Sequence, residues 1–481
     1  MAIPSNTIWE VRTGGNVLNG GGFVTGSGGT DYSLQDSAQL SVADGSSSST
    51  TNLNSATGGF TAAMVGNILC ISGGTLTVGR YRITAYVDTN NVTLDRALNT
   101  GSGSTVNVGG ALSTPEDADP AATYAGYVAG NTIYIASGTY TKTSTRTLTV
   151  DGDLTGGEVT FIGYLAGGSR SDIDIVEASM PIFTSATNSI VIFSTDAANR
   201  VRFRNIKCTH TAATRGVGFG NTANTSTGII YENCIADGCS IGFYPGSGNN
   251  LTFALYSRCL AKNCISAGFY LNASPTCRYE YCVATGTTAG PGFGFGSGNA
   301  INVSYYRCIS SNNKGNAGNG WSDLSTTSNI AAMVNFDNCL AYGNVAHGWQ
   351  YFFTTGGYRN ASYNNCMAVA NSGFGVRIGS TGLMDGKFPR VRNFAYFNNT
   401  SGNYSGFKDG DNIINLLTDP FTLASTGNFT LNSNISGGRY LKGSGYPAEI
   451  GPKSSITTNF DDVGVAQHSD NSMIFILGMM E

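Results

Sequence analysis

Tyr231-Glu-Asn-Cys234-Ile-Ala is the phrase around which the chain is built, because close copies of it return at regular intervals. The next copy reads Leu255-Tyr-Ser-Arg-Cys259-Leu-Ala. Further copies are centred on Cys282, Cys308, Cys339 and Cys366. The steps between successive cysteines are 25, 23, 26, 31 and 27 residues. A period of this length is typical of a stacked repeat, in which each copy packs on its neighbours.

Each copy repeats the same kinds of side chain at the same distances from its cysteine. An aromatic residue lies three positions before the cysteine, an apolar residue one position after it and a small residue two positions after it. The position five residues after the cysteine holds Cys239, Cys264, Thr287, Asn313, Asn344 and Asn371. Later in each copy a glycine precedes an aromatic ring, which is Phe243, Phe269, Phe293, Trp321, Trp349 or Phe374.

These columns predict an all-β fold, a parallel β-solenoid. The apolar runs are too short for helices, and Gly, Asn and Ser separate them. We expect one coil to consist of a short strand, a bend, a second strand and a loop, with like residues stacked roughly 4.8 Å apart. Asn tolerates the left-handed backbone of a bend, and stacked Asn side chains can exchange amide hydrogen bonds between coils. Thiols and aromatic rings would fill the interior in the same way.

The composition excludes several classes of function. Charged residues make up 12% of the chain, about half the usual share of roughly 25%. The net charge is −4, which argues against a nucleic-acid partner. No apolar run approaches the ~20 residues of a membrane helix, so we expect no membrane insertion. Residues 1–7 show neither the basic start nor the apolar core of a secretory signal.

The chain has 11 cysteines and only 3 histidines, His210, His347 and His468. The histidines are far apart in the sequence, so we expect no metal and no cofactor. Most cysteines fall in the repeat columns, where a free thiol serves as a small apolar core residue. Disulfides such as Cys234–Cys239 are the alternative, although assembly in a reducing cytoplasm would keep them reduced.

Three segments are expected along the chain. Residues 1–115 read as a small β-rich domain for attachment to a partner, with strands at 7–12, 67–72, 80–87 and 91–95. Residues 116–420 read as the solenoid, opened by a short helix at 124–129 that caps its exposed end. Residues 421–481 add short strands and an apolar tail. That tail would contact a partner or the last coil through Met473, Phe475, Leu477 and Met480.

Candidates for chemistry are weak in this sequence. Glycoside hydrolysis needs two carboxylates roughly 5–9.5 Å apart. The carboxylates on the repeat are Glu232, Asp237, Glu280, Asp323 and Asp337, and ordinary solvent-facing positions explain them better. The acidic loop 408–412 reads more readily as a turn than as a metal site, and the Gly-rich run 292–298 lacks the lysine and helix of a phosphate loop. Trp321 and Trp349 could stack on a sugar, but they share a column with core phenylalanines. We therefore predict no catalytic residue.

Residues 116–470 resemble the right-handed parallel β-helix proteins of tailed bacteriophages. The resemblance rests on three features of the sequence: the opening Thr132-Ile-Tyr-Ile…Gly138-Thr-Tyr, the Asn-Cys and Gly-Phe/Trp repeats, and the closing Asp462-Val-Gly-Val. The start, Ile8-Trp-Glu-Val-Arg…Asn19-Gly-Gly-Gly-Phe, is similar to openings of phage structural proteins. The resemblance implies a right-handed, single-stranded parallel β-helix that forms homotrimers.

Two roles follow from this resemblance. The first is a tailspike-like decoration or cement protein that binds the major capsid protein, braces the shell and projects from the virion after assembly in the host cytoplasm. The alternative is a tailspike or fibre that binds, and in some cases depolymerises, a host surface glycan. We expect the first role, because no group of catalytic carboxylates stands out. The extra residues at 316–327, within the longest step of the repeat, are the loop expected to contact a partner.

Overall fold

The computed structural model describes residues 3–170, 175–195, 198–220, 227–245, 253–271, 276–295, 302–315, 317–323, 332–353, 359–380, 390–405, 411–426 and 428–441. Within these ranges the protein is almost entirely β-structure, and the one α-helix, α1 (Gly438–Leu441), is a single turn. The chain forms two compact units. Unit 1 comprises residues 1–142, 146–184 and 195–207, and unit 2 comprises residues 143–145, 185–194 and 208–481.

Unit 1 contains a closed antiparallel barrel with strand order β3-β4-β7-β6-β5-β8. The strands are β3 (Leu40–Ser48), β4 (Asn52–Asn54), β5 (Ile68–Ile71), β6 (Gly79–Asp88), β7 (Asn91–Leu94) and β8 (Thr100–Val108). The short turns η1 (Tyr32–Leu34) and η2 (Ala62–Met64) accompany it. Its interior is apolar because alternate residues of these strands, such as Leu53, Ile83 and Val106, point inward. Closure leaves no unpaired strand edge in this barrel.

Unit 1 also contains the opening coils of the solenoid. A parallel sheet runs through β1 (Thr7–Val11), β9 (Thr132–Ala136), β11 (Val159–Tyr164) and β14 (Val201–Arg204). Antiparallel to β1 lies β2 (Gly22–Val24), and β10 (Thr139–Thr141) pairs with β12 (Ile182–Ser185). Residues 7–11 therefore belong to the first coil, and the barrel is inserted after it.

The helix expected at 124–129 does not form, and that prediction was wrong. Two backbone N–H groups of this segment, those of Gly126 and Tyr127, both donate to the carbonyl of Ala118 at 2.9 Å. This holds the segment as an irregular loop against η3 (Pro115–Ala118). Tyr127 instead caps the core by packing edge-on against Trp9, with ring centroids 5.1 Å apart.

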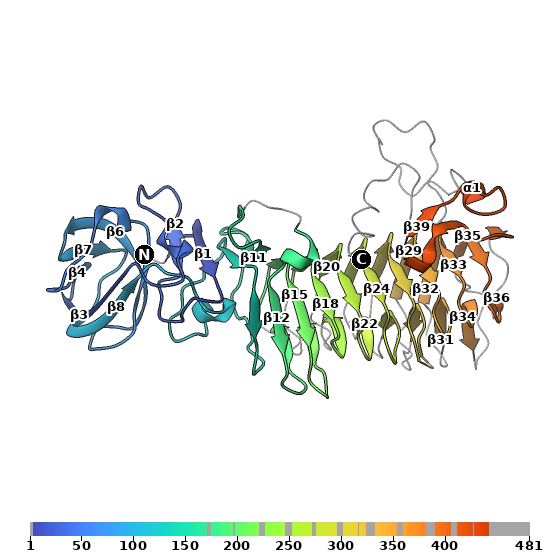
Figure 1. The fold of residues 1–481 in the computed structure, drawn as a ribbon, viewed down its shortest axis with the longest axis horizontal. Helices are drawn as coiled ribbons and strands as arrows, with labels where there is room; N and C mark the ends of the chain where they lie inside the picture. The colour runs from blue at the N-terminus through green and yellow to red at the C-terminus, as the bar shows by residue number, and fades with distance from the viewer. Residues whose placement is uncertain are drawn as a thin grey trace. The chain divides into compact units, whose positions relative to one another are not determined.

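Unit 2 confirms the parallel β-solenoid predicted from the repeat, with three strands in a coil instead of two (Figure 1). The first strand of each coil belongs to the series β17 (Ile229–Glu232), β20 (Ala254–Ser257), β23 (Thr276–Glu280), β26 (Asn302–Tyr306), β29 (Ala332–Asp337) and β32 (Arg359–Asn364). The longer strand β35 (Arg390–Phe397) continues both this series and the second one, and β37 (Asp411–Asn415) pairs with it. The second belongs to β15 (Lys207–His210), β18 (Ile235–Asp237), β21 (Leu260–Lys262), β24 (Val283–Thr285), β27 (Ile309–Ser311), β30 (Leu340–Tyr342) and β33 (Met367–Val369).

The Gly-aromatic segment forms the third strand, which the expected coil of two strands did not include. Its series is β13 (Val191–Ser194), β16 (Val217–Gly220), β19 (Ile241–Tyr244), β22 (Ala267–Leu271), β25 (Phe293–Phe295), β28 (Trp321–Asp323), β31 (Trp349–Phe353), β34 (Phe374–Ser380) and β36 (Gly402–Ser405). These strands form a separate parallel sheet, in which Phe243 pairs with Phe269 and Phe269 with Phe293. The glycine before each ring lets the backbones of successive coils approach; a Cβ on Gly242 would lie 2.5 Å from the carbonyl oxygen of Gly268.

Two left-handed residues turn the chain in each coil. One directly precedes the cysteine, with φ of 48° at Asn233, 56° at Asn338 and 53° at Asn365. The other follows four positions after the cysteine, with φ of 66° at Gly238 and 54° at Asn263. Asn and Gly populate this conformation at little cost, so the sequence encodes the bend angles directly.

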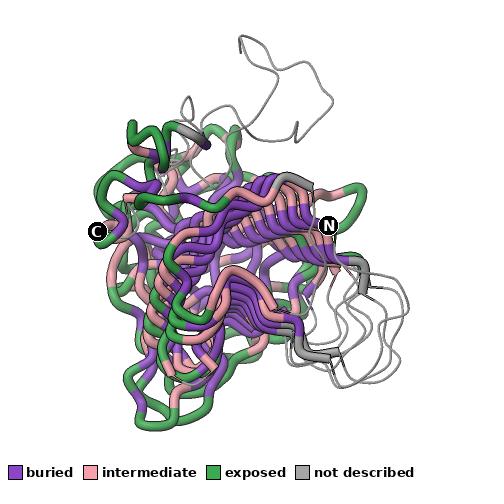
Figure 2. Tube along the Cα trace, turned by 90° about the vertical axis from the view of Figure 1, so that its right-hand side faces the viewer, coloured by how far each residue is buried: buried purple, intermediate pink, exposed green. Residues whose placement is uncertain are grey.

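The last described strands of unit 2 pack on the outside of the solenoid. An antiparallel hairpin of β38 (Phe421–Leu423) and β39 (Asn428–Leu431) lies against Tyr342, whose ring is 5.1 Å from that of Phe429. The turns η4 (Glu177–Ser179) and η5 (Ala424–Thr426) complete the assigned elements. Figure 2 marks how far each residue is buried along the chain trace, and the strands of the stacked coils are mostly buried or intermediate.

Candidate functional site

The six repeat cysteines lie in the interior of unit 2 as free, buried thiols. Each thiol from the second copy onward donates to a backbone carbonyl of the preceding coil. The Sγ of Cys282 lies 3.4 Å from the oxygen of Tyr256, and the Sγ of Cys366 lies 3.5 Å from that of Phe336. Burial raises the pKa of three thiols of this column, Cys259, Cys308 and Cys366. All six thiols are enclosed in the core, so we assign this column a packing role.

The asparagine column forms a continuous amide ladder. Asn313 Nδ2 donates to Asn344 Oδ1 at 2.8 Å, Asn344 Nδ2 to Asn371 Oδ1 at 2.9 Å, and Asn371 Nδ2 to Asn399 Oδ1 at 2.8 Å. All four side chains are buried. Because each amide is both donor and acceptor, the ladder satisfies polar groups that would otherwise be costly in the core.

Trp321 and Trp349 are fully buried, so neither is available to stack on a sugar. Their rings are parallel with centroids 4.7 Å apart. They continue the stack formed by Phe243, Phe269 and Phe293, in which successive centroids lie 4.7 to 5.1 Å apart. This geometry assigns both tryptophans to the core.

The remaining sequence candidates do not assemble into a catalytic site. Glu232 and Glu280 lie on β17 and β23, with β20 between them, and Glu280 pairs with its own neighbour Arg278. Asp237 lies 3.8 Å from Lys262. Met473, Phe475, Leu477 and Met480 fall outside the described residues, as do residues 408–410 of the acidic loop and the side chain of Asp323. Of the loop expected at 316–327, residues 316 and 324–327 are not described, and residues 321–323 form strand β28 instead of a loop. In the described part of the chain, no group of three or more His, Cys, Asp or Glu side chains is placed to hold a metal ion.

A groove on the outward face of unit 2 is the feature best suited to bind a ligand. It has a volume of about 410 Å³ and crosses β29, β32 and β35. Its described lining is Met333, Asn335, Ala361, Ser362, Asn364, Arg390 and Arg392. Side chains point alternately to the two faces of a strand. The aromatic residue three places before each cysteine is buried, so the residues two and four places before the cysteine point outward.

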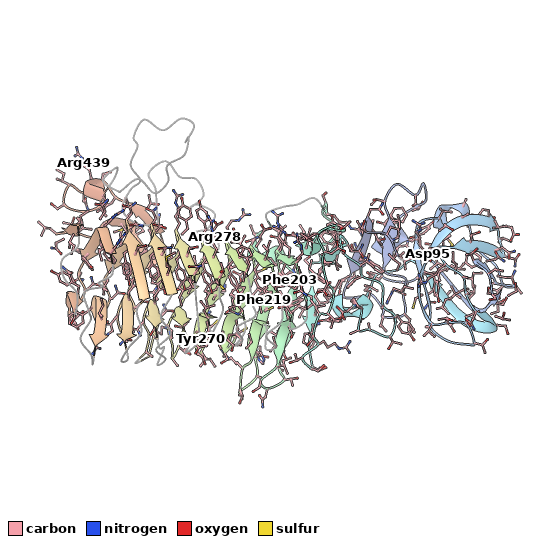
Figure 3. All side chains as sticks on the ribbon, turned by 180° about the vertical axis from the view of Figure 1, so that it is seen from behind. Asp95, Phe203, Phe219, Tyr270, Arg278 and Arg439 are labelled. Atoms are coloured by element: carbon pink, nitrogen blue, oxygen red, sulfur yellow. The ribbon has the colours of Figure 1, made fainter. Side chains whose placement is uncertain are left out.

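Strand register aligns the outward side chains in two rows across the coils. The first row is Arg278, Ser304, Asn335, Ser362 and Arg390. The second row is Glu280, Tyr306, Asp337, Asn364 and Arg392. Figure 3 labels Arg278 on this face, and it labels Tyr270 on the opposite side of the stack. The groove covers the end of the two rows that contains Arg390 and Arg392.

Hydrogen bonds between coils fix the polar side chains of the groove. Ser362 Oγ donates to Asn335 Oδ1 at 2.7 Å, and Asn364 Nδ2 donates to Asp337 Oδ1 at 2.6 Å. The first bond uses the carbonyl oxygen of Asn335, so its amide nitrogen keeps two N–H donors for a ligand. The described lining carries two guanidinium groups and no carboxylate.

Unit 1 holds a buried charged cluster of a different kind. Glu10 accepts hydrogen bonds from Arg12 Nε at 2.8 Å, from Arg170 Nη2 at 2.7 Å and from the hydroxyl of Tyr164. Burial raises the pKa of Glu10, while the facing Arg170 and Arg12 act to lower it. Both carboxylate oxygens are already bonded by side chains of the protein, so we assign this cluster to the stability of unit 1.

A smaller hollow of about 240 Å³ in unit 1 is lined in part by Glu116, Asp117 and Arg146. Lys142 pairs with Glu116, and the carboxylate of Asp117 accepts bonds from the backbone and hydroxyl groups of Ser113 and Thr114. These bonds leave few groups for a ligand, and the groove of unit 2 remains the stronger candidate.

The strand register and the groove together define the class: this protein is a parallel β-solenoid with a polar groove on one sheet. No known family model matches the sequence, and no curated protein resembles it significantly. Among solved structures it is similar to the pectate lyase Pel9A, with 15% identity, a TM-score of 0.49, and coverage of 71% of this chain and 88% of that one.

Two further solved structures are similar to a comparable extent. A rhamnogalacturonan lyase shows 15% identity and a TM-score of 0.46 over 65% of this chain and 89% of that one. The A-module of the Azotobacter vinelandii mannuronan C-5 epimerase AlgE6 shows 12% identity and a TM-score of 0.38 over 59% and 89%. At these values the likenesses carry no argument about the activity of this chain. In the described ranges no helix is long and apolar enough to cross a membrane.

Sequence reasoning missed the groove. The inward columns repeat, whereas the outward rows change identity from coil to coil, so no pattern marks them. The usable signal was two arginines, Arg390 and Arg392, on alternate positions of one strand beside the amide-bearing and hydroxyl-bearing positions of two others.

Proposed function

We propose that this protein is a non-catalytic polysaccharide-binding β-solenoid whose groove holds a segment of an acidic glycan. The observation that carries the proposal is the groove itself, in which amide, hydroxyl and guanidinium groups lie in register on three neighbouring strands. Amides and hydroxyls match the hydroxyl groups of sugars, and a guanidinium fork matches a carboxylate in both charge and geometry.

Binding without cleavage fits the described lining. Glycoside hydrolysis requires a pair of carboxylates flanking the scissile bond. The described lining residues include no carboxylate, and the nearest acid of the second row, Asp337, is bonded to Asn364. We therefore expect no release of reducing ends and no chain shortening when the protein is incubated with a polysaccharide that it binds; sustained cleavage would contradict this reading.

The binding test uses polysaccharides of matched length and different charge. The wild-type protein is titrated calorimetrically with polygalacturonate, with alginate and with neutral dextran. We expect binding to an acidic polymer that weakens as salt is raised, because charge pairs at a surface are screened. Replacing Arg390 and Arg392 together by Ala should weaken that binding at least tenfold.

Arg146→Ala is the matched control, since Arg146 is an exposed arginine of unit 1. It should leave the affinity within a factor of two of the wild type. Equal binding of dextran, no binding of either acidic polymer, or an unchanged affinity of the double variant would each contradict the proposal.

A glycan-binding role agrees with the second of the two roles expected from the sequence, a tailspike or fibre. Membership of a virion, a homotrimeric state and contact with a major capsid protein remain predictions from the sequence resemblance. Counting copies per particle would separate the two roles, because a capsid decoration should be far more abundant than a tailspike.

A further inference from the structure

A cluster of two tyrosines and an arginine lies on the same face as the groove. Tyr281 and Tyr306 meet edge to face, with ring centroids 5.6 Å apart. The guanidinium carbon of Arg307 lies 5.1 Å from the centroid of Tyr306 and 5.7 Å from that of Tyr281. Arg307 Nη1 also donates to the hydroxyl of Tyr281 at 3.4 Å. The cluster is therefore fixed in place by its own contacts, which reduces the entropy that binding would cost.

The cluster is continuous with the groove through the strand register. Tyr306 pairs with Asp337, Asp337 with Asn364, and Asn364 with Arg392, so all four belong to the second row. Three strand spacings separate Tyr306 from Arg392, which is roughly 14 Å. That separation exceeds one sugar ring, so a single ligand can contact both places only as a chain lying across the strands.

The backbone shows that this cluster departs from the repeat. Tyr281 and Arg307 occupy the left-handed bend position, with φ of 54° and 52°. Other coils place Asn there, as at Asn338 and Asn365, because Asn adopts this conformation at lower cost. Arg258 makes the same departure one coil earlier. Residues held in unfavourable backbone conformations concentrate at functional sites. We therefore expect this cluster to have a function.

We propose that Tyr281, Tyr306 and Arg307 form an aromatic subsite of the groove. An acidic glycan would lie along the second row, with a carboxylate at Arg390 and Arg392 and the apolar face of a sugar ring against Tyr306. Tyrosine suits this role because it presents an apolar ring with a polar tip. The inference rests on the proposed function, and it adds the direction of the chain, the minimum ligand length and a residue that determines length preference.

The test compares short and long oligomers on three proteins. Dimers and hexamers of galacturonate and of mannuronate are titrated into the wild type, Tyr306→Ala and Tyr270→Ala. Tyr270 is the control because it is also a half-buried tyrosine of the solenoid and lies on the third-strand sheet. We expect the wild type to bind hexamers at least tenfold more tightly than dimers. Tyr306→Ala should lose that advantage and keep its dimer affinity, and Tyr270→Ala should behave like the wild type.

Each outcome decides between the two ideas. If the hexamer affinity of Tyr306→Ala equals that of the wild type, the subsite is overturned while the proposed function stands. If neither acidic oligomer binds the wild type, the proposed function itself fails. Two further variants keep the test valid should Tyr306→Ala not fold: Tyr306→Phe, which should retain the hexamer preference, and Tyr306→Leu, which should lose it.

Discussion

Asn344 illustrates how one side chain connects several coils. Its Nδ2 donates to Asn371 Oδ1 at 2.9 Å and to the carbonyl of Ser310 at 3.1 Å, and its Oδ1 accepts from Asn313 Nδ2 at 2.8 Å. We expect Asn344→Ala to lower the free energy of unfolding of unit 2 by about 3 kcal/mol, because it strands buried partners above and below. Urea unfolding followed by circular dichroism measures the loss.

Ser266→Ala is the control for this prediction. Its hydroxyl also contacts the next coil, at 3.1 Å from Ser240 Oγ, but in an exposed position. Water replaces an exposed hydrogen bond, so the loss should be below about 0.5 kcal/mol. An equal loss of unfolding free energy in the two variants would show that burial does not determine how much the asparagine ladder contributes to stability.

His347 should make the stability of unit 2 depend on pH. Its Nδ1 accepts from the backbone N–H of Phe374 at 2.8 Å, and its Nε2 lies 3.0 Å from Arg377 Nη1. Protonation of Nδ1 would turn a donor toward the N–H of Phe374, and burial together with Arg377 lowers the pKa of His347 to about 4. The unfolded chain, with a pKa near 6.5, therefore binds the proton more readily.

The stabilisation from a neutral His347 is complete above about pH 6.5 and is lost as the pH falls toward 4. After allowance for solvent screening of this half-buried ring, we expect a loss of about 1 kcal/mol by pH 5. His347→Gln should reduce the slope of stability against pH in this window. Some slope should remain, because burial also lowers the pKa of His210. An identical pH profile in the variant would contradict the assignment.

The coil, as an element, is defined by its two left-handed bends. In the second bend the chain uses Gly238, Asn312, Gly343 and Asn398, with φ between 51° and 66°, but it places Ala370 there with φ of 54°. An alanine in this conformation costs roughly 1–2 kcal/mol relative to the right-handed region. Ala370 is therefore a weak point in an otherwise regular series.

Ala370→Gly should stabilise unit 2 by about 1 kcal/mol, since the relief of strain exceeds the added freedom of glycine in the unfolded chain. The matched control is Ala368→Gly, two positions earlier, where the residue is buried in β33 and φ is not positive. That change should destabilise the protein. Thermal unfolding of both variants gives the comparison, and a stabilised Ala368→Gly would contradict the account.

The elements that could be predicted from the sequence are those whose positions repeat most strictly from coil to coil. Inward columns such as those of Tyr256 and Cys259 repeat because equivalent positions in successive coils have the same packing environment in the core. This repetition was enough to predict the parallel β-solenoid. The third strand was missed because Gly-aromatic pairs resemble loop sequences until their close stacking on the next coil is known. The helix at 124–129 was wrong because backbone bonds from Gly126 and Tyr127 to Ala118, outside the segment, override its local preference. The groove was missed because solvent-facing positions are free to vary.

Across the whole molecule, each of the two units is stabilised by a different kind of internal contact. The barrel of unit 1 closes strands that are distant in sequence, such as β3 and β8, around one apolar core. Unit 2 instead stacks coils whose contacts extend mainly to the next coil, as in the ring series from Phe243 to Trp349. Arrays of this second kind unfold less cooperatively as they lengthen, so a single transition is not expected for the chain.

The three tryptophans allow this to be measured, because Trp9 is in unit 1 and Trp321 and Trp349 are in unit 2. Trp9→Phe leaves fluorescence only from unit 2, and Trp321→Phe with Trp349→Phe leaves it only from unit 1. We expect the two proteins to show different urea midpoints. Circular dichroism on each variant controls for a shift in stability caused by the substitution itself. Coincident fluorescence and dichroism transitions in both variants would show that unit 1 and unit 2 unfold as one cooperative body, because only then would every probe report the same equilibrium.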